Sequence, residues 1–215
     1  MINRLFILFF CIIFSNCCLS QIDHIFYVND VENVEYLTVN FCIDNKGKTS
    51  SVNIVPNKTT YKNENIINQV IEYRKGIEYY PDSNMNNNCY DYTFTFLNIK
   101  YQTETLDSNE LEKCKNFKKG VYKYNNTIHP NTIIERTEEF QIEKTGKDFI
   151  KFKIDWLTPN KYNLTYFEVS DKEYEYLLGE KIEVEIIKII NDNEYLYFSN
   201  LLNRTYTSMI ITKTN

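Results

Sequence analysis

The chain has 215 residues, of which 43% are hydrophobic and 25% are charged, and its formal net charge at pH 7 is −5. This acidic balance disfavours binding to nucleic acid or to an anionic membrane through a general basic field, so no nucleic-acid partner is expected. The length suits one large or two small domains. With 5 glycines and 4 prolines against 18 tyrosines and 14 phenylalanines, the composition favours half-buried strands.

The first twenty residues are typical of a cleavable secretory signal. Arg4 precedes an apolar run over residues 5–14, which is too short to span a hydrocarbon core of about 30 Å. The small side chains of Cys18 and Ser20 suit signal peptidase and predict Gln21 as the first mature residue. The sequence therefore predicts export from the cytoplasm.

Two other interpretations of this segment remain. In the first, the chain is a lipoprotein in which Cys17 or Cys18 is acylated and kept, although Phe14-Ser15-Asn16 matches a lipobox poorly. In the second, an uncleaved segment anchors the chain. Contact with a membrane is expected only if the protein is lipidated. Cleavage after Ser20 removes one arginine and no acid, which leaves 23 basic and 29 acidic residues and a net charge of −6.

The N-terminal half contains two segments of alternating side-chain type. Residues 21–33 are expected to be a flexible N-terminus, and a first domain is expected over residues 34–102. Within it, residues 34–46 and 49–55 predict two strands. The turn between them contains Gly47, which is free to adopt a positive φ.

An amphipathic helix is predicted after these strands, with Asn63 as its cap and Gly76 at its end. Its apolar face contains Ile66, Ile67, Val70 and Ile71. After an asparagine-rich loop, residues 90–98 alternate again and predict a third strand. The order strand, strand, helix, strand predicts an α+β domain with a three-stranded antiparallel sheet and one helix.

This domain resembles the C-terminal domain of TonB-type energy transducers. The similarity covers about residues 34–100 and depends on the segments "VNFCIDNKGKTSSVNIVP", "IEYYP" and "YTFTF" and on the helix between them. It implies a small sheet backed by one helix. It does not imply the function of a transducer, because one fold can support many functions.

The layout implied by this resemblance places the first strand between the second and the third, antiparallel to both. Cys42, late in the first strand, is then expected opposite Cys89, within reach of a disulfide. Two unpaired buried thiols are the alternative. The resemblance also implies that the outer edge of the third strand can accept an extended segment of an envelope protein partner. The candidates for this partner edge are Tyr90, Tyr92, Phe94 and Phe96.

A polar linker over residues 103–113 is expected to lead to a second domain over residues 114–215. Eight short segments in this domain predict strands, and no long helical pattern occurs between them. They are residues 120–125, 132–138, 139–145, 148–157, 161–169, 181–190, 194–199 and 204–212. An antiparallel meander of this kind avoids exposed edges by closing into a barrel, so an all-β antiparallel meander barrel is expected.

The second domain resembles a group of small secreted lipocalin-like proteins of Gram-negative bacteria. The similarity spans about residues 114–213 and depends on a C-x-x-F-x-x-G-x-Y pattern, on "IIERTEEFQIE" and on "DWLTPNKYNLTYF". It implies a secreted or periplasmic location in a Gram-negative envelope, with an outer-membrane lipoprotein as the alternative. Lys161 stands where that pattern usually has a second cysteine. Cys114 is therefore expected to be a free thiol or to pair elsewhere.

An eight-stranded barrel is just wide enough to be filled by side chains or to hold one small ligand. The candidates for a ligand cavity are Arg136, Gln141 and Tyr162, with Trp156 as an apolar wall. Structural roles are the alternative. Arg136 would then pair with Glu138 or Glu143 on the surface, Gln141 would satisfy a backbone group, and Trp156 would plug the bottom of the barrel.

Catalytic chemistry has little support in the sequence. The histidines of the mature chain, His24 and His129, have no spacing to serine, cysteine or carboxylate residues that indicates a triad or a metal site. Glu183 and Glu185 alternate along a strand and are expected to face solvent. The sequence contains no glycine-rich phosphate loop. We therefore expect no enzymatic activity, no cofactor and no metal.

Two functions of different class remain. In the first, the protein is a secreted or periplasmic binding protein whose barrel holds a small apolar ligand. In the second, it is an envelope interaction or assembly protein that docks a partner by strand addition at the N-terminal sheet edge. A continuous cavity beside Arg136 would favour the first function, and a filled barrel with an uncovered strand near residues 90–98 would favour the second.

Overall fold

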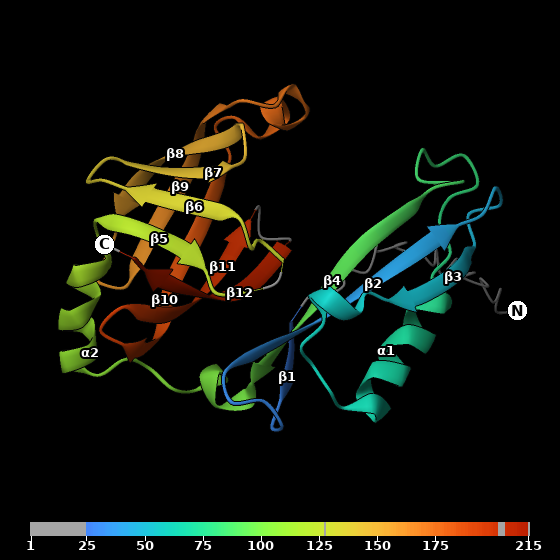
Figure 1. Ribbon diagram of the computed structural model, residues 1–215, viewed down its shortest axis with the longest axis horizontal. Coiled ribbons are helices and arrows are strands. Elements are labelled where there is room, and N and C mark those ends of the chain that lie inside the picture. Colours follow the sequence, from blue (N-terminus) through green and yellow to red (C-terminus); the bar gives the residue numbers. More distant parts are fainter. Residues whose placement is uncertain (1–24, 127, 202–204, 215) are drawn as a thin grey trace, which may run out of the picture.

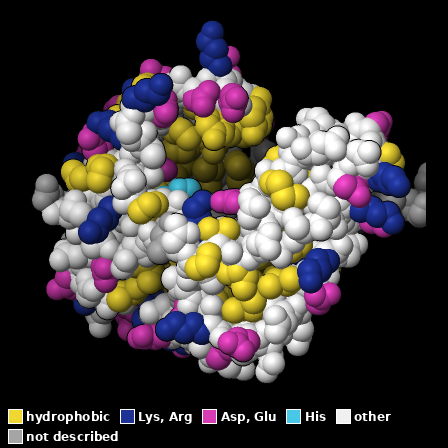
Figure 2. All heavy atoms as spheres, turned by 45° about the vertical axis from the view of Figure 1, so that its right-hand side comes forward, with side chains coloured by type: hydrophobic (Ala, Val, Ile, Leu, Met, Phe, Trp, Pro, Cys, Tyr) yellow, Lys and Arg dark blue, Asp and Glu magenta, His cyan; other side chains and the backbone are white. Residues whose placement is uncertain are grey.

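A computed structural model describes residues 25–126, 128–201 and 205–214 and divides the chain into an N-terminal sheet domain and a C-terminal barrel (Figure 1). The space-filling view in Figure 2 shows the two bodies side by side, with the hollow end of the barrel facing the viewer. The expected signal peptide, its cleavage site and His24 lie outside the described residues. Within the described ranges, no helix is both long and apolar enough to cross a membrane.

The N-terminal sheet has four strands in the order β1-β4-β2-β3. They are β1 (Ile25–Val28), β2 (Val34–Ile43), β3 (Thr49–Ile54) and β4 (Cys89–Asn98). As predicted, β2 lies between β3 and β4 and is antiparallel to both. The α+β class is confirmed.

One feature of this sheet differs from the prediction. β1 forms within the segment expected to be flexible and pairs in parallel with residues 95–98 of β4, so the sheet is mixed and has four strands instead of three. Its side chains are apolar on both faces, and Phe26 stacks on Phe96 with 5.4 Å between ring centroids. Four residues are too few to show an alternating pattern, and tertiary packing stabilises the strand instead.

Helix α1 (Glu64–Lys75) covers one face of the sheet. The side chain of Asn63 accepts a hydrogen bond from the backbone N–H of Ile66, as expected of a cap. The predicted apolar face is buried against the sheet, in a cluster that includes Leu37, Val39, Ile67, Val70 and Phe94. The turn between β2 and β3 requires Gly47, because its φ is +80° and an added Cβ would lie 2.3 Å from the carbonyl oxygen of Tyr79.

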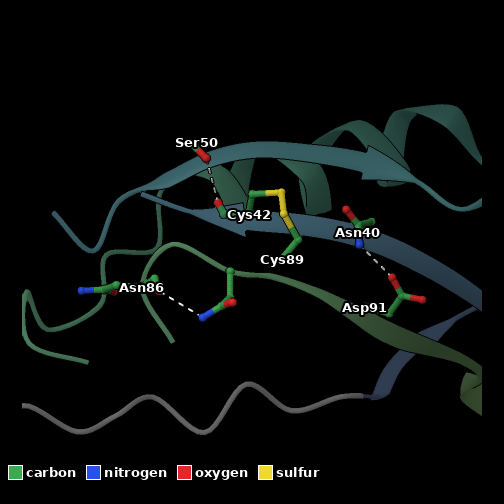
Figure 3. The surroundings of a disulfide bond; sticks show 7 residues. Asn40, Cys42, Ser50, Asn86, Cys89 and Asp91 are labelled. Carbon is green, nitrogen blue, oxygen red and sulfur yellow. Dashed lines mark hydrogen bonds between the residues drawn. A yellow bond between two sulfur atoms is a disulfide. The ribbon is translucent and has the colours of Figure 1, made fainter. Parts of the chain in front are cut away.

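A disulfide joins Cys42 of β2 to Cys89 of β4, and this pairing confirms the prediction (Figure 3). The two residues are direct partners in the antiparallel register, near one end of the sheet. Two positions along the same strand pair, Asn40 donates a hydrogen bond to Asp91 over 2.9 Å. Disulfides are typical of proteins that fold in an oxidising compartment outside the cytoplasm.

The C-terminal domain is a closed barrel of eight strands, each antiparallel to its neighbours, as predicted. The strands are β5 (Gly120–Tyr124), β6 (Thr132–Arg136), β7 (Phe140–Thr145), β8 (Asp148–Trp156), β9 (Lys161–Val169), β10 (Lys181–Asn191), β11 (Glu194–Leu201) and β12 (Thr205–Lys213). Alternate side chains along each strand fill the interior, as with Phe152 and Ile154 of β8.

The expected linker contains a short helix, α2 (Ser108–Lys113), which begins at a capping box formed by Asp107 and Glu110. It continues into the 3-10 helix η3 (Cys114–Phe117), which closes one end of the barrel. Phe117 is buried there, with its ring 4.8 Å from that of Tyr195. Cys114 is a free, fully buried thiol, and burial raises its pKa to about 11.

The two domains share an apolar interface. Tyr36 of β2 belongs to the hydrophobic cluster of the barrel, and its hydroxyl donates to the carbonyl oxygen of Ser208 over 3.1 Å. A second cluster combines Ile25 and Leu97 from the sheet with Leu196 from the outer wall of the barrel. The sheet face opposite α1 is therefore partly covered by the barrel.

Candidate ligand-binding site

The four residues predicted for a ligand cavity come from four strands of the barrel and lie at the end closed by η3. The register pairs Arg136 of β6 with Gln141 of β7, and Trp156 of β8 with Tyr162 of β9. Arg136, Gln141 and Tyr162 are each at most 3% exposed. The structure therefore brings these residues together, in a filled part of the barrel.

Arg136 is surrounded by hydrogen-bond acceptors. Its Nε donates to Gln141 Oε1 over 2.8 Å, and its Nη1 donates to the carbonyl oxygen of Phe117 over 2.8 Å. Its Nη2 donates to the hydroxyls of Tyr162 and Tyr195, both over 3.1 Å. These bonds use most of the five N–H donors of the guanidinium. Arg136 therefore ties η3 to the barrel wall.

The surface ion pair considered for Arg136 is not observed. Arg136 does not pair on the surface, since Glu138 forms its ion pair with Lys119 instead. Trp156 is partly buried and packs its ring 4.4 Å from the ring of Tyr162. Its indole N–H is buried and has no hydrogen-bond partner within the described part of the chain.

A chain of hydrogen bonds leads from Arg136 along the barrel interior. Gln141 accepts from Arg136 and donates through Nε2 to Glu143 Oε1 over 2.7 Å. The hydroxyl of Tyr124 donates to the other carboxylate oxygen, Oε2, over 2.9 Å. Burial raises the pKa of Glu143 above its usual range, and the two hydrogen bonds and the charge of Arg136 partly oppose this shift.

The opposite end of the barrel is open and contains a cavity of about 370 Å³, which we call the mouth pocket. Figure 2 shows this end as a hollow walled by hydrophobic side chains. Ile150 and Phe149 contribute to the wall. The polar and aromatic side chains that line the mouth pocket include Tyr124, His129, Glu143, Asp148, Asp171 and Tyr174. The volume falls within the range of small-molecule sites.

None of the four predicted ligand residues lines the mouth pocket. Glu143, which does line it, was considered from the sequence only as a surface partner of Arg136. The sequence of β7 does indicate an inward position for Glu143. Residues two apart on a strand share a face, and Gln141 and Glu143 both point inward. Which end of the barrel is open depends on η3, a long-range contact that no local pattern shows.

The predicted partner edge on β4 is partly covered by β1. β1 pairs with residues 95–98, so the backbone at Phe96 already has a neighbouring strand. The side chains of Phe94 and Phe96 are fully buried in the core beneath α1, whereas Tyr90 and Tyr92 are partly exposed. Among the described residues, this pairing contradicts the expectation of an open edge over residues 95–98.

Histidine, cysteine and carboxylate side chains form no group of three that could hold a metal ion in the described ranges. Comparisons of the chain with protein-family models, with curated proteins and with solved structures gave no significant match in any of the three.

Proposed function

We propose that this protein is a secreted or periplasmic, non-catalytic binding protein that holds a small, largely apolar ligand in the mouth pocket. The observation that carries the proposal is the mouth pocket itself, a cavity of about 370 Å³ at the open end of a closed barrel. Ligand sites in proteins are concave and mostly apolar, with a few polar groups that orient the ligand, and the mouths of β-barrels are a preferred location.

Three further features support this proposal. The barrel resembles small secreted lipocalin-like proteins of Gram-negative bacteria in its sequence pattern. The disulfide between Cys42 and Cys89 suits an oxidising compartment. The residues at the closed end hold one another through hydrogen bonds, so the barrel can keep its shape around an empty or filled mouth.

Titration with the neutral fluorescent probe N-phenylnaphthylamine tests the proposal. We expect saturable binding of one probe per chain, with enhanced fluorescence because the probe leaves water. The variant Ile150→Trp places an indole ring in the mouth pocket, and this larger side chain should abolish binding of the probe. Leu157→Trp is the matched control, since Leu157 is 59% exposed and does not line the mouth pocket. Equal binding by both variants, or no saturable binding by the parent protein, would contradict the proposal.

The second proposed function is docking of an envelope protein by strand addition. It is supported by the position of β1, which, among the described residues, pairs with residues 95–98 of the outer edge of β4. A photo-crosslinking amino acid at Tyr90 should give one adduct of defined mass in intact cells. The same group at Asn53, on the other edge strand, is the control and should give none. Adducts from both positions, or from neither, would count against docking.

A further inference from the structure

We propose that the mouth pocket selects ligands that carry a positive charge, namely an ammonium group on an apolar body. This inference rests on the proposed binding function of the pocket and names the chemical class of the ligand. It is drawn from the charges, the hydrogen bonds and the aromatic rings that line the cavity.

The described residues that line the mouth pocket include three carboxylates, Glu143, Asp148 and Asp171, and no lysine or arginine. None of the three carboxylates forms an ion pair within the described part of the chain. Among the described lining residues, the side chain that could carry a positive charge is that of His129, whose pKa is lowered by desolvation, which favours the neutral ring at pH 7. A cleft lined by one sign of charge attracts ligands of the opposite sign.

The buried charges inside the barrel reinforce this polarity. Arg136 and Glu143 are bridged by Gln141, with the arginine at the closed end and the carboxylate at the mouth. The negative end of this pair therefore faces an entering ligand. Arg136 is 3% exposed, and its guanidinium donates to four acceptors of the protein, so it is not available to an anionic ligand.

Glu143 retains the capacity to accept another hydrogen bond. Of the about four lone-pair positions of a carboxylate, only two are used, by Tyr124 and Gln141. Burial raises the pKa of Glu143, and an ammonium group beside it would oppose that shift and favour the ionised form. A bound ammonium group would donate to the remaining positions in a site partly shielded from water, where charge–charge attraction exceeds that on an open surface.

Aromatic rings line the same cavity. Tyr124, Phe149 and Tyr174 contribute to its wall, and the ring of His129 lies 5.2 Å from that of Tyr124. The faces of aromatic rings attract cations, and clusters of such rings recognise ammonium groups. The apolar walls would contact the body of the ligand, while the rings and Glu143 would contact its charged end.

Calorimetric titration at pH 7 with three ligands of one shape tests the inference. Phenethylamine is a cation, phenethyl alcohol is its neutral counterpart, and phenylacetate is an anion. We expect the amine to bind about tenfold more tightly than the alcohol, and the anion to bind more weakly than the alcohol. In Glu143→Gln, the preference for the amine should fall by about tenfold, while the affinity for the alcohol stays within about twofold.

Two further variants complete the experiment. Glu135→Gln is the matched control, because Glu135 lies on the outer face of the barrel and pairs with Lys144, and it should leave the preference unchanged. Asp171→Asn keeps an oxygen that can cap the following turn and should reduce the preference by about two- to threefold. It provides a second measurement if Glu143→Gln fails to fold.

The outcomes separate the two proposals. Equal affinities for the amine and the alcohol, or a preference that survives both Glu143→Gln and Asp171→Asn, would overturn the inference and leave the binding function standing. Failure of all three ligands to bind, together with failure of the neutral naphthylamine probe, would overturn the binding function as well.

Discussion

Arg136 illustrates how a single buried charge can organise one end of a barrel. Its hydrogen bonds are charge-assisted and therefore stronger than bonds between neutral groups. They connect β6 to β7, β9, β11 and η3 through Gln141, Tyr162, Tyr195 and Phe117. Removing the arginine would take a charged donor from each of these acceptors, of which the Phe117 carbonyl oxygen keeps a second donor in the Tyr122 hydroxyl, and would leave Glu143 without its nearest buried counter-charge.

We therefore predict that Arg136→Leu lowers the free energy of unfolding by about 3 to 5 kcal/mol, because it removes four charge-assisted hydrogen bonds and leaves the buried carboxyl group of Glu143 without a nearby counter-charge. Urea denaturation at pH 7, followed by circular dichroism, measures this change. The matched control Lys123→Leu, at an exposed position of β5, should change it by less than about 0.5 kcal/mol. A loss below about 1 kcal/mol for Arg136→Leu would show that η3 is held by other contacts.

Glu143 gives the barrel a specific dependence on pH. Its pKa is raised in the folded state, so the folded protein binds this proton more tightly than the unfolded chain does. The contribution of Glu143 to stability is therefore fully present below the unfolded pKa of the group and is lost as pH rises through the folded pKa.

We compare the free energy of unfolding of the parent protein with that of Glu143→Gln between about pH 4 and about pH 8. The stability of the parent relative to the variant should increase as pH falls through the folded pKa, and should then level off. Urea midpoints at each pH measure the difference. A difference that is constant with pH, or that decreases as pH falls, would contradict the raised pKa.

At the scale of the elements, the sequence predicted the parts whose pattern is local. The barrel strands alternate over five to eleven residues, and α1 has both a cap and an apolar face, so they were predicted within a few residues. β1 was missed because four apolar residues have no detectable period. α2 was missed although Asp107 and Glu110 have the spacing of a capping box, because the segment was interpreted from its polarity alone.

The candidate site was predicted less well than the fold, for a physical reason. Sequence pattern can place Arg136, Gln141, Trp156 and Tyr162 on inward-facing positions, but it cannot show which end of a barrel is covered. That depends on the contact between Phe117 and Tyr195, which are far apart in the chain. Strand alternation alone could have placed Glu143 inside the barrel.

The disulfide is the element-scale feature with the most direct test. It closes a loop over a sequence separation of 47 residues, and the chain-entropy treatment of such a loop gives about 4 kcal/mol of stabilisation. We predict that replacing both Cys42 and Cys89 with alanine lowers the free energy of unfolding by about 2 to 4 kcal/mol. Thermal and urea unfolding measure it. The parent protein treated with a reductant should match the double variant, and a mismatch would indicate that the substitutions disturb the sheet by themselves.

At the scale of the whole molecule, the interface between the domains decides whether they unfold together. Tyr36 is 3% exposed, packs in the cluster of the barrel and donates to the backbone of β12, although it belongs to the sheet. Large apolar interfaces couple domains, whereas small polar ones allow independent motion.

We predict one unfolding transition in calorimetry for the parent protein and two for Tyr36→Ala, because the variant removes a ring that fills the shared core. Tyr80→Ala is the matched control, since Tyr80 is 59% exposed, and it should keep a single transition. Two transitions already in the parent protein would mean that the interface does not couple the domains.

The closure of the barrel by η3 has a kinetic consequence. With Phe117 seated over one end and the mouth pocket at the other, a ligand that enters through the mouth must leave along the same route in reverse. Bulky substitutions at the rim that leave the lining side chains unchanged would then slow capture and escape by the same factor and leave the equilibrium affinity almost unchanged. Residence time would then depend on the side chains at the entrance, and equilibrium affinity on the side chains that line the mouth pocket.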